Sequence, residues 1–162
     1  MNYFYLDASA WVKRYHSELG SDIVDLLFKK ATSPQKIITS IWSLGETFAV
    51  LNRNKNRFNI TKKDFNKITS AFLADSEILH LLPLSDNHLF KSIEHINKYN
   101  LNSADAYHLS NTIYLKETLA QLNYNIVFVS ADLRLIKSAK GEGLFVFNPE
   151  SDANSHLLDL LK

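Results

Sequence analysis

Cysteine is absent from this chain of 162 residues, and glycine and proline are scarce, with 4 and 3 residues. The lack of cysteine excludes disulfides and thiolate metal sites. The scarcity of glycine and proline excludes a repetitive or linker-like chain. No apolar run approaches the length of a membrane span, and the first apolar run is broken by Asp7 before it reaches the length of a signal peptide. We therefore expect a cytoplasmic protein without a membrane segment.

Charges of the two signs nearly balance, since 18 Lys and Arg residues face 17 Asp and Glu residues for a net charge of +1. The overall field therefore does not attract nucleic acid, and any such binding requires a local patch. A hydrophobic content of 46% and a charged content of 22% indicate a folded chain. The length favours a single domain over residues 1–162.

Apolar runs alternate with amphipathic segments along the whole chain. Strands are expected at residues 2–7, 36–40, 78–82, 126–129 and 144–147. Helices are expected between and after them, with Ser33-Pro34 ending one. This alternation predicts an α/β fold, a three-layer α/β/α sandwich with a mainly parallel central sheet of about five strands.

The first expected strand ends on a carboxylate. Tyr3 to Leu6 are apolar or aromatic, which is typical of a strand buried on both faces. Asp7 follows, and Ser9 can cap a helix that begins at Ala10. Asp7 is therefore expected at the carboxyl edge of the sheet, where open α/β sheets bind ligands. The alternative is that Asp7 is only a turn or capping residue.

Three further carboxylates are candidates for the same edge. Asp132 follows the strand at 126–129, so a parallel sheet places it beside Asp7. Glu46 lies in a helix directly after the second strand, in a mostly apolar setting; alternatively its stem packs while its carboxylate reaches water. Asp105 lies in the first turn of a helix, where the helix dipole alone also favours an anion.

A group of four carboxylates without a cation would repel one another and raise one another's pKa. Oxygen ligands, without cysteine or clustered histidine, suit Mg²⁺ or Mn²⁺ better than Zn²⁺. The reaction most often served by such a site is phosphodiester hydrolysis, in which the metal activates water and stabilises the leaving oxygen.

Four segments together resemble the PIN-domain ribonucleases and, within them, the VapC-type toxins of bacterial and archaeal toxin–antitoxin pairs. In the order of that family, these segments are Tyr5 to Lys13, Leu44-Gly45-Glu46, Ser103 to Leu109 and Phe128 to Leu135. The resemblance implies a Mg²⁺- or Mn²⁺-dependent endoribonuclease acting on tRNA or another structured RNA. The acidic residues that it implies are Asp7, Glu46, Asp105 and Asp132.

The same resemblance implies supporting residues and partners. Ser9, and Ser130 where relatives often have Thr, are expected to hold a carboxylate or a water molecule of the metal site. The expected partners are a small antitoxin that covers the acidic edge and a second copy of the chain in a homodimer. Apolar helical residues of the first half exceed what one small core needs, so we expect a dimer surface around Ile23, Leu27, Phe48 and Leu51.

Basic residues near the acidic edge are the candidates for contact with the RNA backbone. Lys13, Arg14 and Arg134 lie just beyond that edge in the sequence. A second basic run, from Arg53 to Arg57, is more typical of a solvated helix end. His108 follows Asp105 by one helical turn, and it either orients that carboxylate or packs in the core.

Three other functions compete with the ribonuclease. A phosphoryl-transfer enzyme with Asp7 as nucleophile needs a lysine near the strand edge, and the sequence offers no clear one. A non-catalytic PIN-like scaffold that binds RNA or protein would not need all four carboxylates. An RNA-processing nuclease without an antitoxin fits the same residues as a toxin does.

Overall fold

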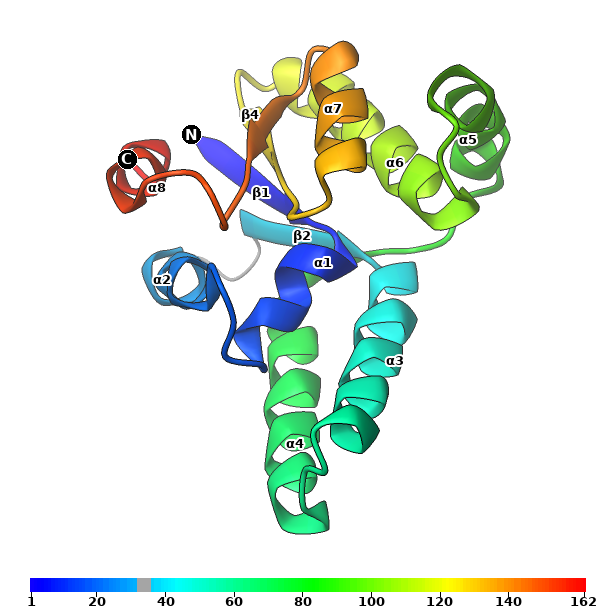
Figure 1. Ribbon diagram of the computed structural model, residues 1–162. Helices are drawn as coiled ribbons and strands as arrows, with labels where there is room; N and C mark the ends of the chain where they lie inside the picture. The colour runs from blue at the N-terminus through cyan, green and yellow to red at the C-terminus, as the bar shows by residue number, and fades with distance from the viewer. Residues whose placement is uncertain (32–35) are drawn as a thin grey trace.

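The computed structural model describes residues 1–31 and 36–162, so the expected helix end at Ser33-Pro34 lies outside the described residues (Figure 1). The strands in these residues are β1 (Asn2–Leu6), β2 (Ile37–Ser40), β3 (His80–Leu82), β4 (Asn125–Val129) and β5 (Phe145–Phe147). The helices are α1 (Ala8–Trp11), the 3₁₀ turn η1 (Val12–Arg14), α2 (Ser21–Lys30), α3 (Ile41–Arg57), α4 (Lys62–Ile78), α5 (Asp86–Tyr99), α6 (Ser103–Ala120), α7 (Leu133–Gly141) and α8 (Asn154–Leu160).

The strands form one parallel sheet in the order β3-β2-β1-β4-β5 within the described residues. β1 is the central strand, and its Leu6 is in register with Val129 of β4. The chain builds outward from β1 to β3 on one side and then returns beside β1 with β4. The order therefore reverses between β1 and β4, and such a reversal leaves a crevice outside the carboxyl ends of the two strands.

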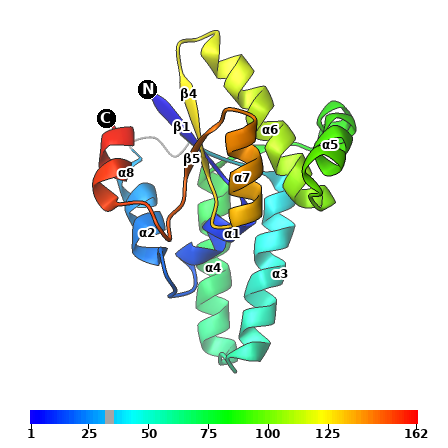
Figure 2. The ribbon, with the colours of Figure 1, turned by 45° about the horizontal axis from the view of Figure 1, so that its top comes forward.

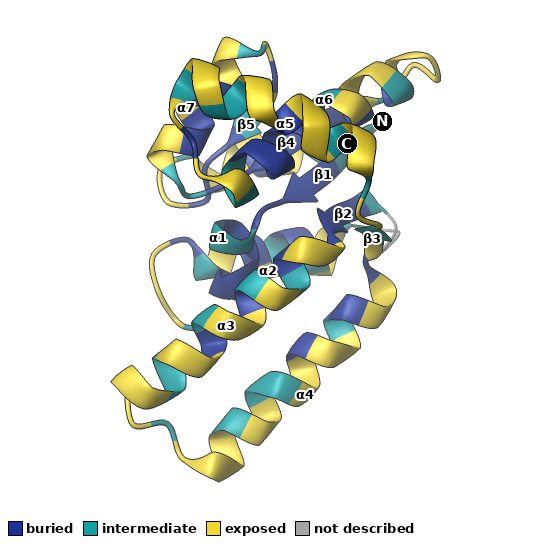
Figure 3. Ribbon diagram, turned by 90° about the vertical axis from the view of Figure 1, so that its right-hand side faces the viewer, coloured by how far each residue is buried: buried dark blue, intermediate teal, exposed yellow. Residues whose placement is uncertain are grey.

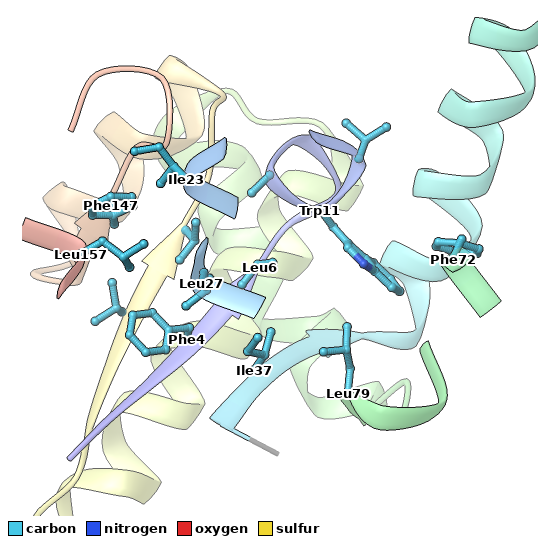
Figure 4. Close-up of a cluster of buried hydrophobic side chains, with 14 of the residues drawn as sticks. Phe4, Leu6, Trp11, Ile23, Leu27, Ile37, Phe72, Leu79, Phe147 and Leu157 are labelled. Atoms are coloured by element: carbon cyan, nitrogen blue, oxygen red, sulfur yellow. The ribbon is translucent and has the colours of Figure 1, made fainter. Parts of the chain in front are cut away.

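Helices cover both faces of the sheet, which confirms the three-layer prediction (Figures 1 and 2). Phe4 and Leu6 of β1 point into one apolar cluster, and Tyr5 between them points into the other, as the two-residue period of a strand requires. The first cluster, drawn in Figure 4, includes Trp11 and Leu157. It packs α1, α2, α4 and α8 against the sheet, whereas α6 and α7 supply the buried helical residues of the second cluster.

α3 and α4 form a hairpin that extends away from the sheet, as Figures 1 and 3 show from two sides. The ring of Phe48 on α3 lies 6.4 Å from that of Phe65 and 6.0 Å from that of Phe72, both on α4. Phe72 in turn lies 5.0 Å from Trp11 of α1, so the base of the hairpin is joined to the core.

Two local predictions were wrong. α1 begins at Ala8 rather than Ala10, because the side chain of Asp7, not that of Ser9, accepts the capping hydrogen bond from the Ala10 amide. The third strand begins at His80 rather than Ile78, because α4 continues through Ile78 and the Leu79 amide still donates to the carbonyl of Asp75.

The expected dimer surface was also wrong in most of its residues. Ile23, Leu27 and Leu51 are buried in the first apolar cluster, and only Phe48 remains exposed. One core of this size therefore uses more of the helical apolar surface than the sequence pattern suggested. Within the described part of the chain, no helix combines the length and the apolar character needed to cross a membrane.

Candidate active site

A cavity of about 630 Å³ opens at the carboxyl edge of β1 and β4, and residues of α1, α3, α6 and the loop before α7 line it. Figures 1 and 2 show the ribbons of α1, α3 and α7 around this edge of the sheet. All four expected carboxylates line it, and they come from four separate segments of the chain: Asp7, Glu46, Asp105 and Asp132. The other charged residues that line it are Lys13, Glu18, Arg53, His108 and Glu150. The reversal of strand order thus coincides with the acidic cavity.

Asp7 is buried, and both of its carboxylate oxygens accept hydrogen bonds. Its Oδ1 accepts hydrogen bonds from the Ala10 amide at 2.9 Å and from Ser9 Oγ at 2.8 Å, and its Oδ2 accepts one from Ser130 Oγ at 2.7 Å. Burial raises the pKa of Asp7, and the hydrogen bonds from Ser130, the Ala10 amide and Ser9 partly oppose that rise. Asp7 thus caps α1 and also lines the acidic cavity.

Ser9 and Ser130 connect the two strand ends. Ser9 Oγ accepts a hydrogen bond from the Ala131 amide at 2.9 Å, and Ser130 Oγ accepts one from the Asp132 amide at 3.1 Å. The two hydroxyl oxygens lie 3.3 Å apart. Each serine therefore touches Asp7 and also fixes the loop that carries Asp132.

Asp132 and Asp105 face the cavity from the starts of α7 and α6. Asp132 caps α7, because its Oδ1 accepts hydrogen bonds from the amides of Arg134 and Leu135 at 2.8 and 3.0 Å. The pKa of Asp105 is raised, first by burial and then by the negative charges of Asp132 and Asp7. These three carboxylates are therefore close enough to repel one another.

Glu46 reaches the cavity from α3 and is bound by a buried histidine. His108 Nε2 lies 2.8 Å from Glu46 Oε2, and the opposite ring nitrogen lies 2.8 Å from the hydroxyl of Tyr5. The sequence indicated a neighbour of Asp105 or a core residue, but it gave no signal that His108 contacts Glu46, 62 positions away.

The basic candidates differ in their surroundings. Lys13 is only 3% exposed, and its Nζ contacts Glu150 at 2.6 Å and Glu18 at 3.2 Å. Arg14 is not among the residues lining the cavity in the described structure, and its guanidinium contacts Asp25 and Asp75 instead. Arg134 is the solvent-exposed candidate: its side chain is 54% exposed, and its guanidinium lies 3.5 Å from the carboxylate of Asp105.

Sequence reasoning missed three residues at the cavity. Arg53 was interpreted as a solvated helix end, yet it lines the cavity from α3. Glu18 and Glu150 also line it, and both are bound to Lys13. Glu18 follows η1 and Glu150 follows β5, so no local motif relates them, and only the fold brings them together.

The chemistry of the cavity fits a hard divalent cation. Its candidate ligands are carboxylate oxygens. Burial first, and then the negative charges of Asp132 and Asp7, raise the pKa of Asp105, and a cation would relieve the repulsion between these charges. Among residues 1–31 and 36–162, however, no three acidic or histidine side chains are arranged closely enough to form a finished metal cage. Asp7, Asp105 and Asp132, with Glu46, therefore fit the cation by ligand type and charge, and binding requires their side chains to draw together.

The PIN domain family model matches residues 4–140. The match covers most of the chain and includes all four carboxylates, so the chain belongs to the PIN domain family. A comparison with curated protein sequences gives no match.

Solved structures share the fold at low sequence identity. PAE2754 from Pyrobaculum aerophilum has a TM-score of 0.66 and 17% identity, over 99% of this chain and 98% of that one. FitAcB from Neisseria gonorrhoeae has a TM-score of 0.61 and 13% identity, over 92% and 99%. VapC20 from Mycobacterium tuberculosis, a toxin that cleaves the sarcin–ricin loop, has a TM-score of 0.57 and 14% identity, over 83% and 94%. At these identities the similarity shows the fold alone.

Proposed function

We propose that this protein is a Mg²⁺- or Mn²⁺-dependent endoribonuclease that hydrolyses phosphodiester bonds of RNA and serves as the toxin of a toxin–antitoxin pair. The observation that carries the proposal is the convergence of Asp7, Glu46, Asp105 and Asp132 on one cavity at the edge where the strand order reverses. PIN domains are generally nucleases, and VapC20, which has a similar fold, is a toxin that cleaves the sarcin–ricin loop.

In this proposal Asp7, Asp105 and Asp132 hold the cation and Glu46 completes the acidic set. The bound cation supplies a Lewis acid for the phosphate and lowers the pKa of water. Ser9 and Ser130 hold Asp7 in one orientation through their hydroxyl groups, and their hydrogen bonds favour its ionised form. The amides at the start of α7 fix one oxygen of Asp132, which directs the other oxygen away from the helix.

Phosphates of the RNA meet the exposed arginines at the cavity. Arg53 lines the cavity from α3, whereas Arg134 of α7 contacts one of the acidic residues, its guanidinium lying 3.5 Å from Asp105. Guanidinium groups match the geometry of phosphate oxygens and bind them without reading the base sequence. Lys13 is held by Glu18 and Glu150, so it orders the wall of the cavity rather than extending toward a substrate.

The site is tested with purified protein and structured RNAs, including tRNA, in Mg²⁺ or in EDTA. Hydrolysis by water leaves 5′-phosphate and 3′-hydroxyl ends, because the ribose 2′-hydroxyl is not the attacking group. Asp7→Asn is expected to lower turnover by orders of magnitude while RNA binding persists. Asp22→Asn, on the exposed side of α2, is the matched control. Cleavage that persists in EDTA, or that leaves 2′,3′-cyclic phosphates, would falsify this mechanism.

The toxin role and the antitoxin need a separate test. We propose that the partner is a small protein that covers the acidic cavity, so it must bring positive charge to Asp105 and Asp132. Induced expression of the wild-type chain in a bacterial host is expected to arrest growth, and Asp7→Asn is expected to relieve the arrest. RNA cleavage in vitro without growth arrest would favour a processing nuclease without an antitoxin.

We also propose that a second copy of the chain packs on α5. Leu89, Phe90 and Ile93 lie on one face of this outer helix and are all exposed, Phe90 by 72% (Figure 1). Light scattering at micromolar concentration is expected to show a dimer for wild type and for Leu73→Glu on α4, where Leu73 is also exposed. A double change of Phe90 and Ile93 to Glu is expected to give a monomer, and an unchanged dimer would exclude this face.

A further inference from the structure

A continuous chain of buried polar side chains runs behind the acidic cavity. Asn111 Nδ2 donates to the Tyr5 hydroxyl at 3.3 Å, that hydroxyl lies 2.8 Å from His108 Nδ1, and His108 Nε2 lies 2.8 Å from Glu46 Oε2. Tyr5, His108 and Asn111 are almost completely buried. Of the four linked side chains, only Glu46 is open to solvent, 28% exposed where it enters the cavity.

The direction of these hydrogen bonds fixes where the imidazole carries its proton. The phenol of Tyr5 keeps its proton, because burial raises its pKa well above the usual value. The Glu46 carboxylate can only accept, so the neutral imidazole carries its hydrogen on Nε2, and its unprotonated Nδ1 can accept the hydrogen of the Tyr5 hydroxyl. His108 Nδ1 is then the acceptor, and Nε2–H donates to the carboxylate of Glu46.

We infer that His108 is a positioning residue for Glu46, held in its Nε2–H tautomer by Tyr5, so that it fixes one carboxylate oxygen and leaves the other for the cavity. The expected effect of His108 on metal binding rests on the proposed metal-dependent function. The hydrogen bonds that hold Glu46 do not depend on that function. Partners that orient a metal-binding side chain from behind commonly change metal affinity or activity 10- to 100-fold when they are removed.

The surroundings of Glu46 explain why it needs this partner. Glu46 follows Gly45 on α3, and in the described residues His108 is its only hydrogen-bonding side chain. Of its neighbours at helical spacing, Ala49 and Val50 are apolar, and among the described contacts neither Trp42 nor Ser43 donates a hydrogen bond to it. Without His108, the flexible stem would allow the carboxylate to turn toward bulk water.

The first test reads the geometry without metal or substrate. Nitrogen-15 NMR of the histidine ring at neutral pH distinguishes the two nitrogens, and His108→Gln assigns the signal. In wild-type protein, we expect Nε2 protonated and Nδ1 unprotonated. Tyr5→Phe is expected to abolish that preference. A wild-type His108 that exchanges between tautomers, or that keeps its tautomer in Tyr5→Phe, would overturn the inference.

The second test is a double-mutant cycle on Mn²⁺ affinity, measured by calorimetry with wild type, His108→Leu, Glu46→Gln and the double variant. Loss of His108 is expected to weaken Mn²⁺ binding about 10- to 100-fold when Glu46 is present. The same change is expected to have little effect in the Glu46→Gln background. Equal losses in both backgrounds would mean that His108 supports only the fold.

Three variants keep this result interpretable. His108→Gln can donate a hydrogen bond from its amide, so it is expected to recover part of the affinity. Tyr5→Phe/His108→Leu removes both partners of a buried hydrogen bond, which protects the fold if His108→Leu alone is unstable. His156→Leu, at an exposed histidine of α8 outside the cavity, is expected to leave Mn²⁺ affinity unchanged.

Failure of the inference is distinct from failure of the proposed function. If wild-type protein neither binds Mn²⁺ nor cleaves RNA, the metal-dependent function fails, and the NMR result alone decides whether His108 holds Glu46. If wild type cleaves RNA and the cycle shows no coupling, the function stands and the positioning role is excluded.

Discussion

Ser130 Oγ donates a hydrogen bond to Asp7 Oδ2 at 2.7 Å, across the carboxyl ends of two neighbouring parallel strands. The same hydroxyl oxygen accepts from the Asp132 amide. One serine therefore orients the carboxylate of β1 and fixes the loop that carries the carboxylate after β4.

Ser130→Ala is expected to raise the pKa of Asp7 further above its ordinary value. The hydrogen bond favours the ionised carboxylate, so its loss leaves less to oppose the effect of burial on the pKa of Asp7. Mn²⁺ affinity measured against pH should then fall at a higher pH than in wild type. Ser130→Thr keeps the hydroxyl and serves as the control. If Mn²⁺ affinity falls at the same pH in Ser130→Ala as in wild type, Ser130 does not stabilise the ionised form of Asp7.

Asp105→Asn is expected to stabilise the metal-free protein at neutral pH. The pKa of Asp105 is raised in the folded state, so the folded chain binds this proton more tightly than the unfolded chain does. The free energy of unfolding therefore falls as the pH rises from the ordinary Asp pKa to the raised pKa of the folded state. Above both pKa values, the folded state carries the full destabilisation by this charge. The variant avoids that cost.

Thermal melts in EDTA measure this effect. The melting temperature of Asp105→Asn is expected to exceed that of wild type by about 1–3 °C at pH 7, because water partly screens this carboxylate. The difference in melting temperature should shrink at pH 4.5. A clear loss of stability at pH 7 would mean that Asp105 is needed mainly for its hydrogen bond with Asn102 at the start of α6.

Mn²⁺ is expected to raise the melting temperature of wild type, because a cation that binds only the folded state stabilises it by mass action. Binding at about 100 times the dissociation constant corresponds to roughly 2.7 kcal/mol. Asp7→Asn/Asp105→Asn should lose this shift. Asp22→Asn/Asp86→Asn removes the same charge at two exposed positions and should keep it. Equal shifts in both variants would place the cation elsewhere.

Lys13→Met is expected to destabilise the fold by about 1–3 kcal/mol, because it leaves Glu18, Glu150 and the carbonyl of Leu19 without their shared donor. Lys67→Met removes an exposed pair with Asp64 and should cost less than about 0.5 kcal/mol. Urea denaturation of the two variants makes the comparison. Similar losses would show that the burial of Lys13 has little energetic effect.

The sequence predicts the sheet well because its signals are local. Each strand of the described residues is a short apolar run, and the fold follows from their alternation with helices. The meeting of Asp7 and Asp132 at the carboxyl edge can be predicted in the same way, because each follows a strand within three residues and a parallel sheet aligns the ends of the two strands.

Contacts between distant side chains were beyond that reasoning. His108 binds Glu46 across the space between α6 and α3, and Lys13 binds Glu150 from a segment 137 positions away. Neither pair has a periodic or motif signal. The prediction of a dimer surface at Ile23 and Leu27 was wrong for a related reason, since the helical pattern around them shows an apolar face but not what packs against it.

The central position of β1 has a consequence for the synthesis of the chain. β1 is made first, yet its register with β4 joins Leu6 to Val129, and the Asp7 amide donates to the carbonyl of Val129. The ribosome must therefore add more than a hundred residues, on the order of ten seconds of translation, before Asp7 and Asp132 can share a cavity. A nascent chain thus carries Asp7 in an unassembled site until β4 and Asp132 have been synthesised.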